Sequence, residues 1–283
     1  MIRILLTLIL IPFTFSWSIM LAQPTECGNV DFATTCNDAC VTCGDIDGLM
    51  LTTLENMGGS LPPGFCTAFS HTSSWLGFVA GSENLTLRVN VGNCTGSATE
   101  MGIYEGCNCS NYRLVSNCNT MMNQNTMYDF FNTVPLDIGK YYWLVFDGNG
   151  ESACDVTFEV VSGSIGAGGN VQVGPIEGET IVCPGDVESY SIPEVGTCNY
   201  NWTLDGGGFF TTPTNSNTVD VEWTGEGEWL LCVEPEIICG GSSQECITIE
   251  VQGQQEPTEI GPVFVCEGES YNYNGEEYFE GIN

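Results

Sequence analysis

Basic side chains are scarce in this sequence. Its 283 residues contain four Lys or Arg and one His against 36 Asp or Glu, for a formal net charge of −32. A surface this negative repels the phosphates of nucleic acids and the head groups of anionic membranes. We therefore expect no nucleic-acid partner and no binding to an anionic lipid surface.

The second part of the chain has no base at all. Residues 165–283 hold 21 acids and no Lys, Arg or His. Acid–base chemistry there would have only carboxyl and tyrosine groups, with no cationic group to stabilise a transition state. Unpaired carboxylates repel one another, and hard divalent cations relieve this repulsion. The pattern favours an extracellular structure that calcium stabilises over catalysis.

Two acidic loops are candidate calcium sites. Asp45 and Asp47 alternate before a glycine, and Asp147, Asn149 and Glu151 form a second run of oxygen-bearing side chains. Neither run matches the twelve-residue EF-hand loop. The alternative is that both are solvated acidic turns.

Long apolar runs are absent after the first 22 residues. A short basic start, Met1–Arg3, precedes an apolar run, Ile4–Leu21, and Ala22 then gives way to polar residues. These are the parts of a secretory signal peptide. The alternative is an uncleaved membrane anchor, but Pro12 and the hydroxyl side chains weaken a span. We expect residues 1–22 to be a cleaved signal, with no membrane span afterwards and a secreted or cell-surface location.

Helical periodicity is also missing. Residues 85–91 alternate strictly between apolar and polar, as in a half-buried strand. Short strands are expected at 75–80, 101–104, 141–146, 156–161, 188–192, 200–204, 218–223, 228–233 and 247–251. Frequent turn residues between them favour β-sandwiches. The predicted fold is all-β, with two disulfide-rich antiparallel sandwiches in tandem and the start of a third repeat.

Cysteine, by contrast, is abundant. All 16 cysteines follow the predicted signal, and in an exported chain they indicate disulfides. The disulfide candidates are Cys27, Cys36, Cys40, Cys43, Cys66, Cys94, Cys107, Cys109, Cys118, Cys154, Cys183, Cys198, Cys232, Cys239 and Cys246. The pairing stays open, because the number of cysteines between 183 and 246 is odd: five. One of them must pair with Cys266, pair with a cysteine of another domain, or stay unpaired. Cys40 and Cys43 form a CxxC that could bind zinc or act in redox chemistry, but with no second CxxC nearby we favour structural disulfides.

The same features divide the chain. We expect a signal peptide at 1–22, a first sandwich at 23–164, a linker at 165–170, a second sandwich at 171–252, and a linker with a truncated third repeat at 253–283. The motif Cys183–Asp186 returns 83 residues later as Cys266–Glu269, each time with a tyrosine shortly after it. The stub after Cys266 is too short to bury a core. The sequence is therefore expected to be a fragment of a longer multi-domain repeat protein.

Residues 27–163 resemble the bacterial pre-peptidase C-terminal-type β-sandwich. The resemblance rests on the segments 75–80, 85–89, 102–106, 135–148 and 154–160. It implies a non-catalytic appendage of secreted and surface proteins. The ten cysteines depart from the usual cysteine-poor form and look like a disulfide-rich variant from exported proteins of Bacteroidetes-type bacteria.

Residues 171–252 resemble a PKD-type or Ig-like surface repeat. The segments that carry this resemblance are 182–185, 200–203, 219–223 and 247–251. The resemblance implies an extracellular sandwich module. Folds of this kind share such patterns without sharing a function.

Candidate functional residues are few. His71, the only histidine, could act in a Ser–His–Asp triad, but no nucleophile-elbow sequence is present, and we expect a polar residue that leads into a strand. Trp223 and Trp229 are candidate sugar-stacking residues, whereas Trp202 shares a strand face with Tyr200 and is expected in the core. No catalytic residue is assigned, and catalysis by this chain is not expected.

The composition, the strand pattern and the two resemblances predict a structural function. We expect a non-catalytic adhesion or structural protein of the cell surface or the extracellular space, with glycans or surface proteins as partners. The alternative is an accessory carbohydrate- or protein-binding region of a larger secreted hydrolase.

Overall fold

The computed structural model describes residues 24–55, 58–66, 71–166, 170–253, 266, 268–273 and 276–279. The predicted signal peptide lies outside these residues, and so do parts of the predicted linkers and third repeat. Strands dominate the described residues, and the helical pieces are the two 3-10 turns η1 (Cys36–Asp38) and η2 (Cys107–Cys109). The prediction of an all-β, sandwich-type fold is confirmed.

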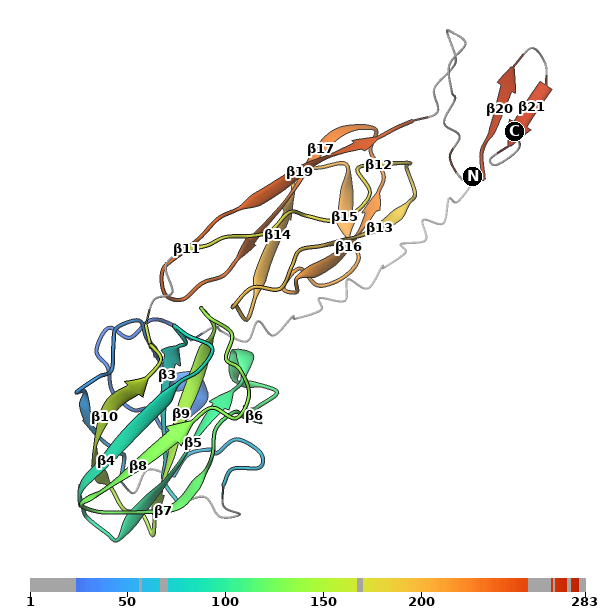
Figure 1. The fold of residues 1–283 in the computed structure, drawn as a ribbon. Coiled ribbons are helices and arrows are strands. Elements are labelled where there is room, and N and C mark those ends of the chain that lie inside the picture. Colours follow the sequence, from blue (N-terminus) through green and yellow to red (C-terminus); the bar gives the residue numbers. More distant parts are fainter. Residues whose placement is uncertain are drawn as a thin grey trace, which may run out of the picture.

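The first sandwich, residues 24–166, consists of two sheets (Figure 1). One sheet has the order β1 (Val41–Thr42), β3 (Ser73–Val79), β9 (Tyr141–Asn149), β5 (Ala98–Glu105), β6 (Arg113–Leu114), and β7 (Asn119–Asn123) also pairs with β5. The other has the order β2 (Met50–Thr52), β10 (Cys154–Ser162), β4 (Thr86–Cys94), β8 (Thr126–Phe131). The predicted alternation of β4 is real, because Leu87, Val89 and Val91 are buried between the sheets while their neighbours face outward.

A further layer covers the outer face of the first sheet. Every residue of β3 is buried, and β9 is buried from Tyr141 to Gly148. Trp75 and Trp143 stand on this outer face in edge-to-face contact, in a second apolar cluster with Phe65 from the preceding loop. Burial on both faces explains why the sequence of β9 is continuously apolar instead of alternating.

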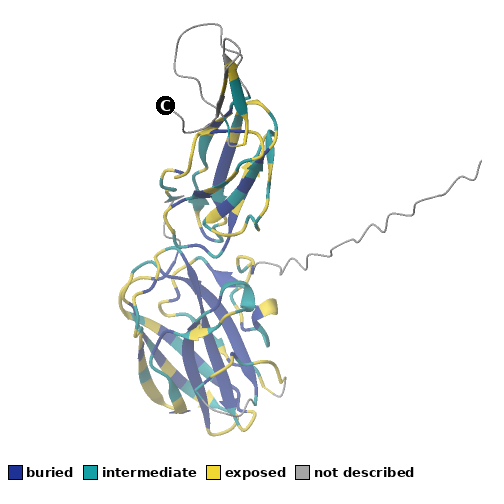
Figure 2. Cartoon of the chain, turned by 90° about the vertical axis from the view of Figure 1, so that its right-hand side faces the viewer, coloured by how far each residue is buried: buried dark blue, intermediate teal, exposed yellow. Residues whose placement is uncertain are grey.

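The second sandwich, residues 170–253, is smaller. One sheet has the order β12 (Ile181–Val182), β19 (Glu245–Val251), β17 (Gly227–Pro235), β14 (Tyr200–Leu204), and the other has the order β13 (Val187–Ser191), β16 (Thr218–Trp223), β15 (Gly208–Phe210). A two-stranded pair, β11 (Asn170–Val171) and β18 (Gly241–Ser242), completes it. The core lies between the sheets, where Figure 2 shows buried strand segments.

Three pairings of short strands are parallel, whereas the other strand pairs of the two sandwiches are antiparallel as predicted. β1 pairs with β3, β11 with β18 and β12 with β19 in parallel. Parallel pairing needs a long crossover connection, and in each case the chain passes through other elements before it returns. Sequence patterns of single strands carry no information on such pairing.

The predicted internal repeat has a structural counterpart. Asp186 N donates to Cys183 O at 3.1 Å, and Glu269 N donates to Cys266 O at the same distance. Gly185 and Gly268 occupy the same position in these turns with φ of +97° and +81°, a backbone region that favours glycine. The hairpin of β20 (Ser270–Tyr273) and β21 (Glu276–Phe279) follows the second turn, as β13 follows the first.

Candidate functional site

His71 lies two residues before β3 and contacts one buried acid. Its Nδ1 lies 3.2 Å from Oδ2 of Asp147, and its side chain is partly exposed. Within the described part of the chain, no hydroxyl or thiol group hydrogen-bonds the ring. The histidine therefore has an acidic partner but no nucleophile from these residues, and a triad is not assembled here.

Asp147 is fully buried and holds the backbone before β3. It accepts hydrogen bonds from the backbone N–H of His71 at 3.0 Å and of Thr72 at 2.7 Å. A buried carboxylate with these donors is satisfied by the protein itself. The calcium prediction for this loop then depends on Asn149, the last residue of β9, and on Glu151 in the turn that follows.

Asp45 and Asp47 lie at the other end of β10 from that turn. Asp45 Oδ1 accepts the N–H of Asp47 at 3.0 Å, and Asp47 Oδ1 accepts the N–H of Val160 at 2.9 Å. Val160 and Cys154 are six residues apart on one strand, or about 20 Å at ~3.3 Å per residue, so the two acidic loops do not meet. Among the described residues, no group of three or more His, Cys, Asp or Glu side chains is placed to hold a metal ion.

The two tryptophans predicted to stack on sugars, Trp223 and Trp229, differ in their exposure. Trp223 is completely buried in the second core, and its Nε1 donates to Tyr190 Oη at 3.1 Å. The prediction of Trp223 as a sugar-stacking residue is therefore wrong, because its ring has no exposed face. Trp229 is half-buried, with Nε1 donating to Gly225 O at 2.8 Å and its ring over Gly206 and Gly207.

Trp202 is buried at 3% exposure, as expected of a core residue. Burial also raises the pKa of Tyr190, the hydroxyl partner of Trp223, to about 12. The core of the second sandwich thus contains large aromatic side chains, and the polar atoms of Trp223 and Tyr190 are paired with each other inside it.

All sixteen cysteines form disulfides. The pairs are Cys27–Cys40, Cys36–Cys109, Cys43–Cys239, Cys66–Cys118, Cys94–Cys154, Cys107–Cys198, Cys183–Cys266 and Cys232–Cys246. The two cysteines of the CxxC bond to different partners, so they form neither a redox pair nor a zinc site.

Two of these bonds cross from one sandwich to the other. Cys43 bonds to Cys239 and Cys107 bonds to Cys198, from two separate loops on each side. The surrounding contact is apolar, because Ile238 and Cys239 pack into the same cluster as Trp143 of the first sandwich. We call this region the joint; Figures 1 and 2 show the two sandwiches stacked end to end there. Sequence reasoning missed it, since cysteine spacing does not reveal connectivity.

The joint is also close-packed in its backbone. A Cβ atom on Gly196 would lie 1.9 Å from the carbonyl oxygen of Ile138, so only glycine allows this approach. Next to it, Lys140 Nζ lies 2.6 Å from Glu105 Oε1 and 3.2 Å from Asp137 Oδ2. Burial opposes the charges of this pair, but their hydrogen bonds and mutual attraction outweigh it, so the pKa of Glu105 is lowered and that of Lys140 is raised.

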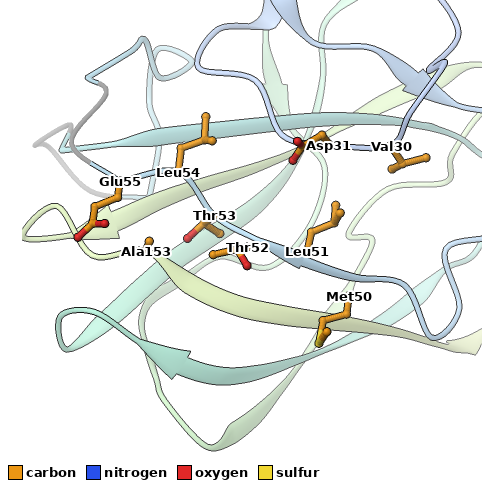
Figure 3. A pocket seen from close by; sticks show the side chains of 9 residues that line it. All are labelled: Val30, Asp31, Met50, Leu51, Thr52, Thr53, Leu54, Glu55 and Ala153. Atoms are coloured by element: carbon orange, nitrogen blue, oxygen red, sulfur yellow. The ribbon is translucent and has the colours of Figure 1, made fainter.

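A hollow lies along β2 at the edge of the second sheet (Figure 3). Its volume is about 580 Å³, and its lining comprises Val30, Asp31, Met50, Leu51, Thr52, Thr53, Leu54, Glu55 and Ala153. Val30, Leu51 and Leu54 pack against the first core and form an apolar floor. Asp31 and Glu55 are exposed at its rim. No sequence pattern pointed to this hollow, because its parts come from three separated segments.

Comparison with known proteins identifies one part of the chain. Residues 169–251 match the family described as PKD-like domain. The PKD part of the resemblance is thus confirmed; no comparison supports the pre-peptidase C-terminal part, which stays a prediction. No match was found among curated proteins.

A solved structure was also compared. The crystal structure of a β-1,2-glucanase from Parabacteroides distasonis aligns over 74% of this chain and 38% of its own chain, with 9% identity and a TM-score of 0.20. The chain thus spans well under two thirds of that glucanase, and a similarity this low carries no argument about fold or activity. The PKD-like segment and the eight disulfides are typical of extracellular proteins. No helix among the described residues is long and apolar enough to cross a membrane.

Proposed function

We propose that this chain is a secreted or cell-surface, non-catalytic structural or adhesive protein that holds its sandwich domains at a fixed angle. The observation that carries the proposal is the joint. Two disulfides from separate loops remove the rotation that a single bond would leave between two bodies. Domains joined only by a flexible linker move relative to one another by default, so a cross-linked and apolar joint indicates selection for rigidity.

Other features support the same proposal. All thiols are consumed in disulfides, which suits the oxidising conditions outside the cell. The Cys183–Cys266 bond ties the second sandwich to the turn that opens the next hairpin, so covalent links continue along the chain. In this proposal the segment 1–22 directs export, and residues 27–163 serve as a non-catalytic module.

The alternative, an accessory region of a larger hydrolase, loses one of its two proposed sugar-binding residues. Trp223 is in the core, which leaves Trp229 as the remaining tryptophan candidate. Glycan-array binding that vanishes on Trp229→Ala would favour this alternative over the structural role.

Small-angle X-ray scattering tests the proposed rigidity. The full chain should fit a single conformation, whereas a variant with both joint bonds removed, Cys43→Ser/Cys239→Ser/Cys107→Ser/Cys198→Ser, should need an ensemble with a wider spread of interdomain angles. The control, Cys232→Ser/Cys246→Ser, removes a bond inside one sandwich and should leave the angle unchanged. An unmodified chain that already samples a wide spread of angles would overturn the proposal.

A further inference from the structure

Strand β2 presents an open edge. In its ladder with β10, Thr53 N donates to Cys154 O at 2.9 Å and Phe158 N donates to Leu49 O at 3.0 Å, and Leu51 stands opposite Val156 between these pairs. Bonded and non-bonded pairs alternate in an antiparallel ladder. The backbone N–H and C=O groups of Met50 and Thr52 therefore point away from β10, and no strand of the described residues pairs with them.

This open edge borders the hollow. Figure 3 shows Ala153, the residue before β10, on one side of β2 and the segment with Val30 and Asp31 on the other. The segment is fixed in place, because the next residue, Phe32, is buried and its ring lies edge-on to Phe146 with centroids 5.3 Å apart. The hollow is thus a preformed feature of the fold at the edge of a sheet.

The charge at the rim is unbalanced. Neither Asp31 nor Glu55 forms an ion pair with another described residue, since Arg88, Arg113 and Lys140 are all paired elsewhere. The rim thus offers two carboxylates above an apolar floor, next to two backbone donors and two acceptors that no strand of the described residues engages.

We propose that β2 binds an extended, cationic segment of another protein by strand addition. The partner would pair its backbone with Met50 and Thr52, place an apolar side chain on the floor formed by Val30, Leu51 and Leu54, and place basic side chains near Asp31 and Glu55. Backbone pairing at a sheet edge gives affinity, and the side-chain contacts give selectivity.

The charge excludes the other simple occupant, a second copy of this chain. Two copies paired through β2 would bring the same acidic rims together, and each copy carries a net charge of −32. Charged groups beside a short edge strand are a common means of preventing self-association. The same acids attract a cationic strand.

Peptide binding to the full chain tests the proposal. The probe is a blocked, fluorescein-labelled peptide, Lys-Thr-Val-Thr-Val-Thr-Lys, and the control peptide carries Glu at both ends. Fluorescence anisotropy should show binding of the lysine-ended peptide and none of the glutamate-ended one. Each of Asp31→Asn and Glu55→Gln should weaken binding by up to about fivefold, the range for an exposed ion pair. Glu83→Gln, which removes an exposed acid elsewhere on the same sandwich, should have no effect.

A backbone variant separates strand addition from charge attraction. Thr52→Pro removes the N–H that points to the open edge while leaving the ladder with β10 intact, because proline is tolerated where the N–H faces outward. Thr52→Ala keeps that N–H and is the matched control. Binding should be lost with proline and kept with alanine. The proposal is overturned if the lysine-ended peptide does not bind, if both Thr52 variants bind equally, or if Glu83→Gln weakens binding as much as Glu55→Gln.

Discussion

The side chains of Asn108 and Asn199 hydrogen-bond each other in both directions across the joint. Asn108 Nδ2 donates to Asn199 Oδ1 at 2.9 Å, and Asn199 Nδ2 donates back to Asn108 Oδ1 at 3.2 Å. The neighbouring residues, Cys107 and Cys198, form one of the joint disulfides. The amide pair therefore sets the register of the two loops that this disulfide links.

The costs of removing the two amides should not add. Asn108→Ala leaves the buried side chain of Asn199 without its partner, which should lower the free energy of unfolding by about 1–3 kcal/mol. The double variant Asn108→Ala/Asn199→Ala should cost less than the sum of the two single variants, because it strands no polar group. Urea unfolding of all four proteins measures the coupling. Strict additivity would mean that the two side chains do not interact.

The two tryptophan candidates should respond differently to truncation. Trp223→Ala should destabilise the second sandwich by about 3–5 kcal/mol, because it empties a fully buried site. Trp229→Ala should cost about 1–2 kcal/mol, since this ring is half-buried. Thermal melting of both variants provides the comparison. An equal, small loss in both would contradict the placement of Trp223 in the core.

Much of the strand content could be predicted from local pattern. The predicted ranges 200–204 and 218–223 coincide with β14 and β16, because core and solvent faces alternate there. Strands β7 and β8 were missed, since their exposed Met121, Met127 and Phe131 hide the alternation. The composition of a strand reveals its burial only when its exposed face is polar.

The joint and the hollow could not be predicted, for a different reason. Cys43 and Cys239 are 196 residues apart, and their bond depends on how two folded bodies meet. The sequence left the pairing open, with one odd cysteine between residues 183 and 246, whereas in the structure two cysteines of that group, Cys198 and Cys239, bond to the first sandwich. The hollow likewise combines Asp31, Glu55 and Ala153, which are brought together only by the finished sheet.

The ion pair beside the joint should make stability fall in acid. The folded-state pKa of Glu105 lies below its ordinary value of 4.5, mainly through Lys140 and Arg113, which outweigh the opposing effect of burial. A depressed carboxyl pKa contributes stability above the unfolded-state pKa and loses it as pH falls through the folded-state value. The free energy of unfolding should therefore drop below about pH 4.5 in the unmodified chain and less steeply in Glu105→Gln. Parallel pH profiles for the two proteins would contradict this.

Glu188 should change the pH dependence of stability in the opposite direction to Glu105. Burial, together with the charges of Asp186 and Glu179, raises its pKa above 4.5. A raised carboxyl pKa stabilises the fold below the unfolded-state pKa, and that stability is lost as pH rises through the folded-state value. Glu188→Gln should therefore be more stable than the unmodified chain at neutral pH, with no advantage below about pH 4.5.

Denaturant unfolding across this pH range measures the effect of Glu188→Gln. Glu236→Gln, which removes an exposed acid from the same sandwich, is the control for net charge. If both variants gain the same stability at neutral pH, the effect comes from overall repulsion and not from the surroundings of Glu188.

Calcium should raise the melting temperature of the chain. The second sandwich has no base to offset its acids, and in the first sandwich Asp45 and Asp47 lie two residues apart, each with one carboxylate oxygen bonded to a backbone N–H. A cation at a hundredfold excess over its dissociation constant would add about 2.7 kcal/mol to the free energy of unfolding. Thermal melts in calcium, in EDTA and in sodium chloride of equal ionic strength separate binding from screening. Asp45→Asn/Asp47→Asn should remove the part of the shift that belongs to that turn, and equal melting temperatures in calcium and EDTA would show that the acids are merely solvated.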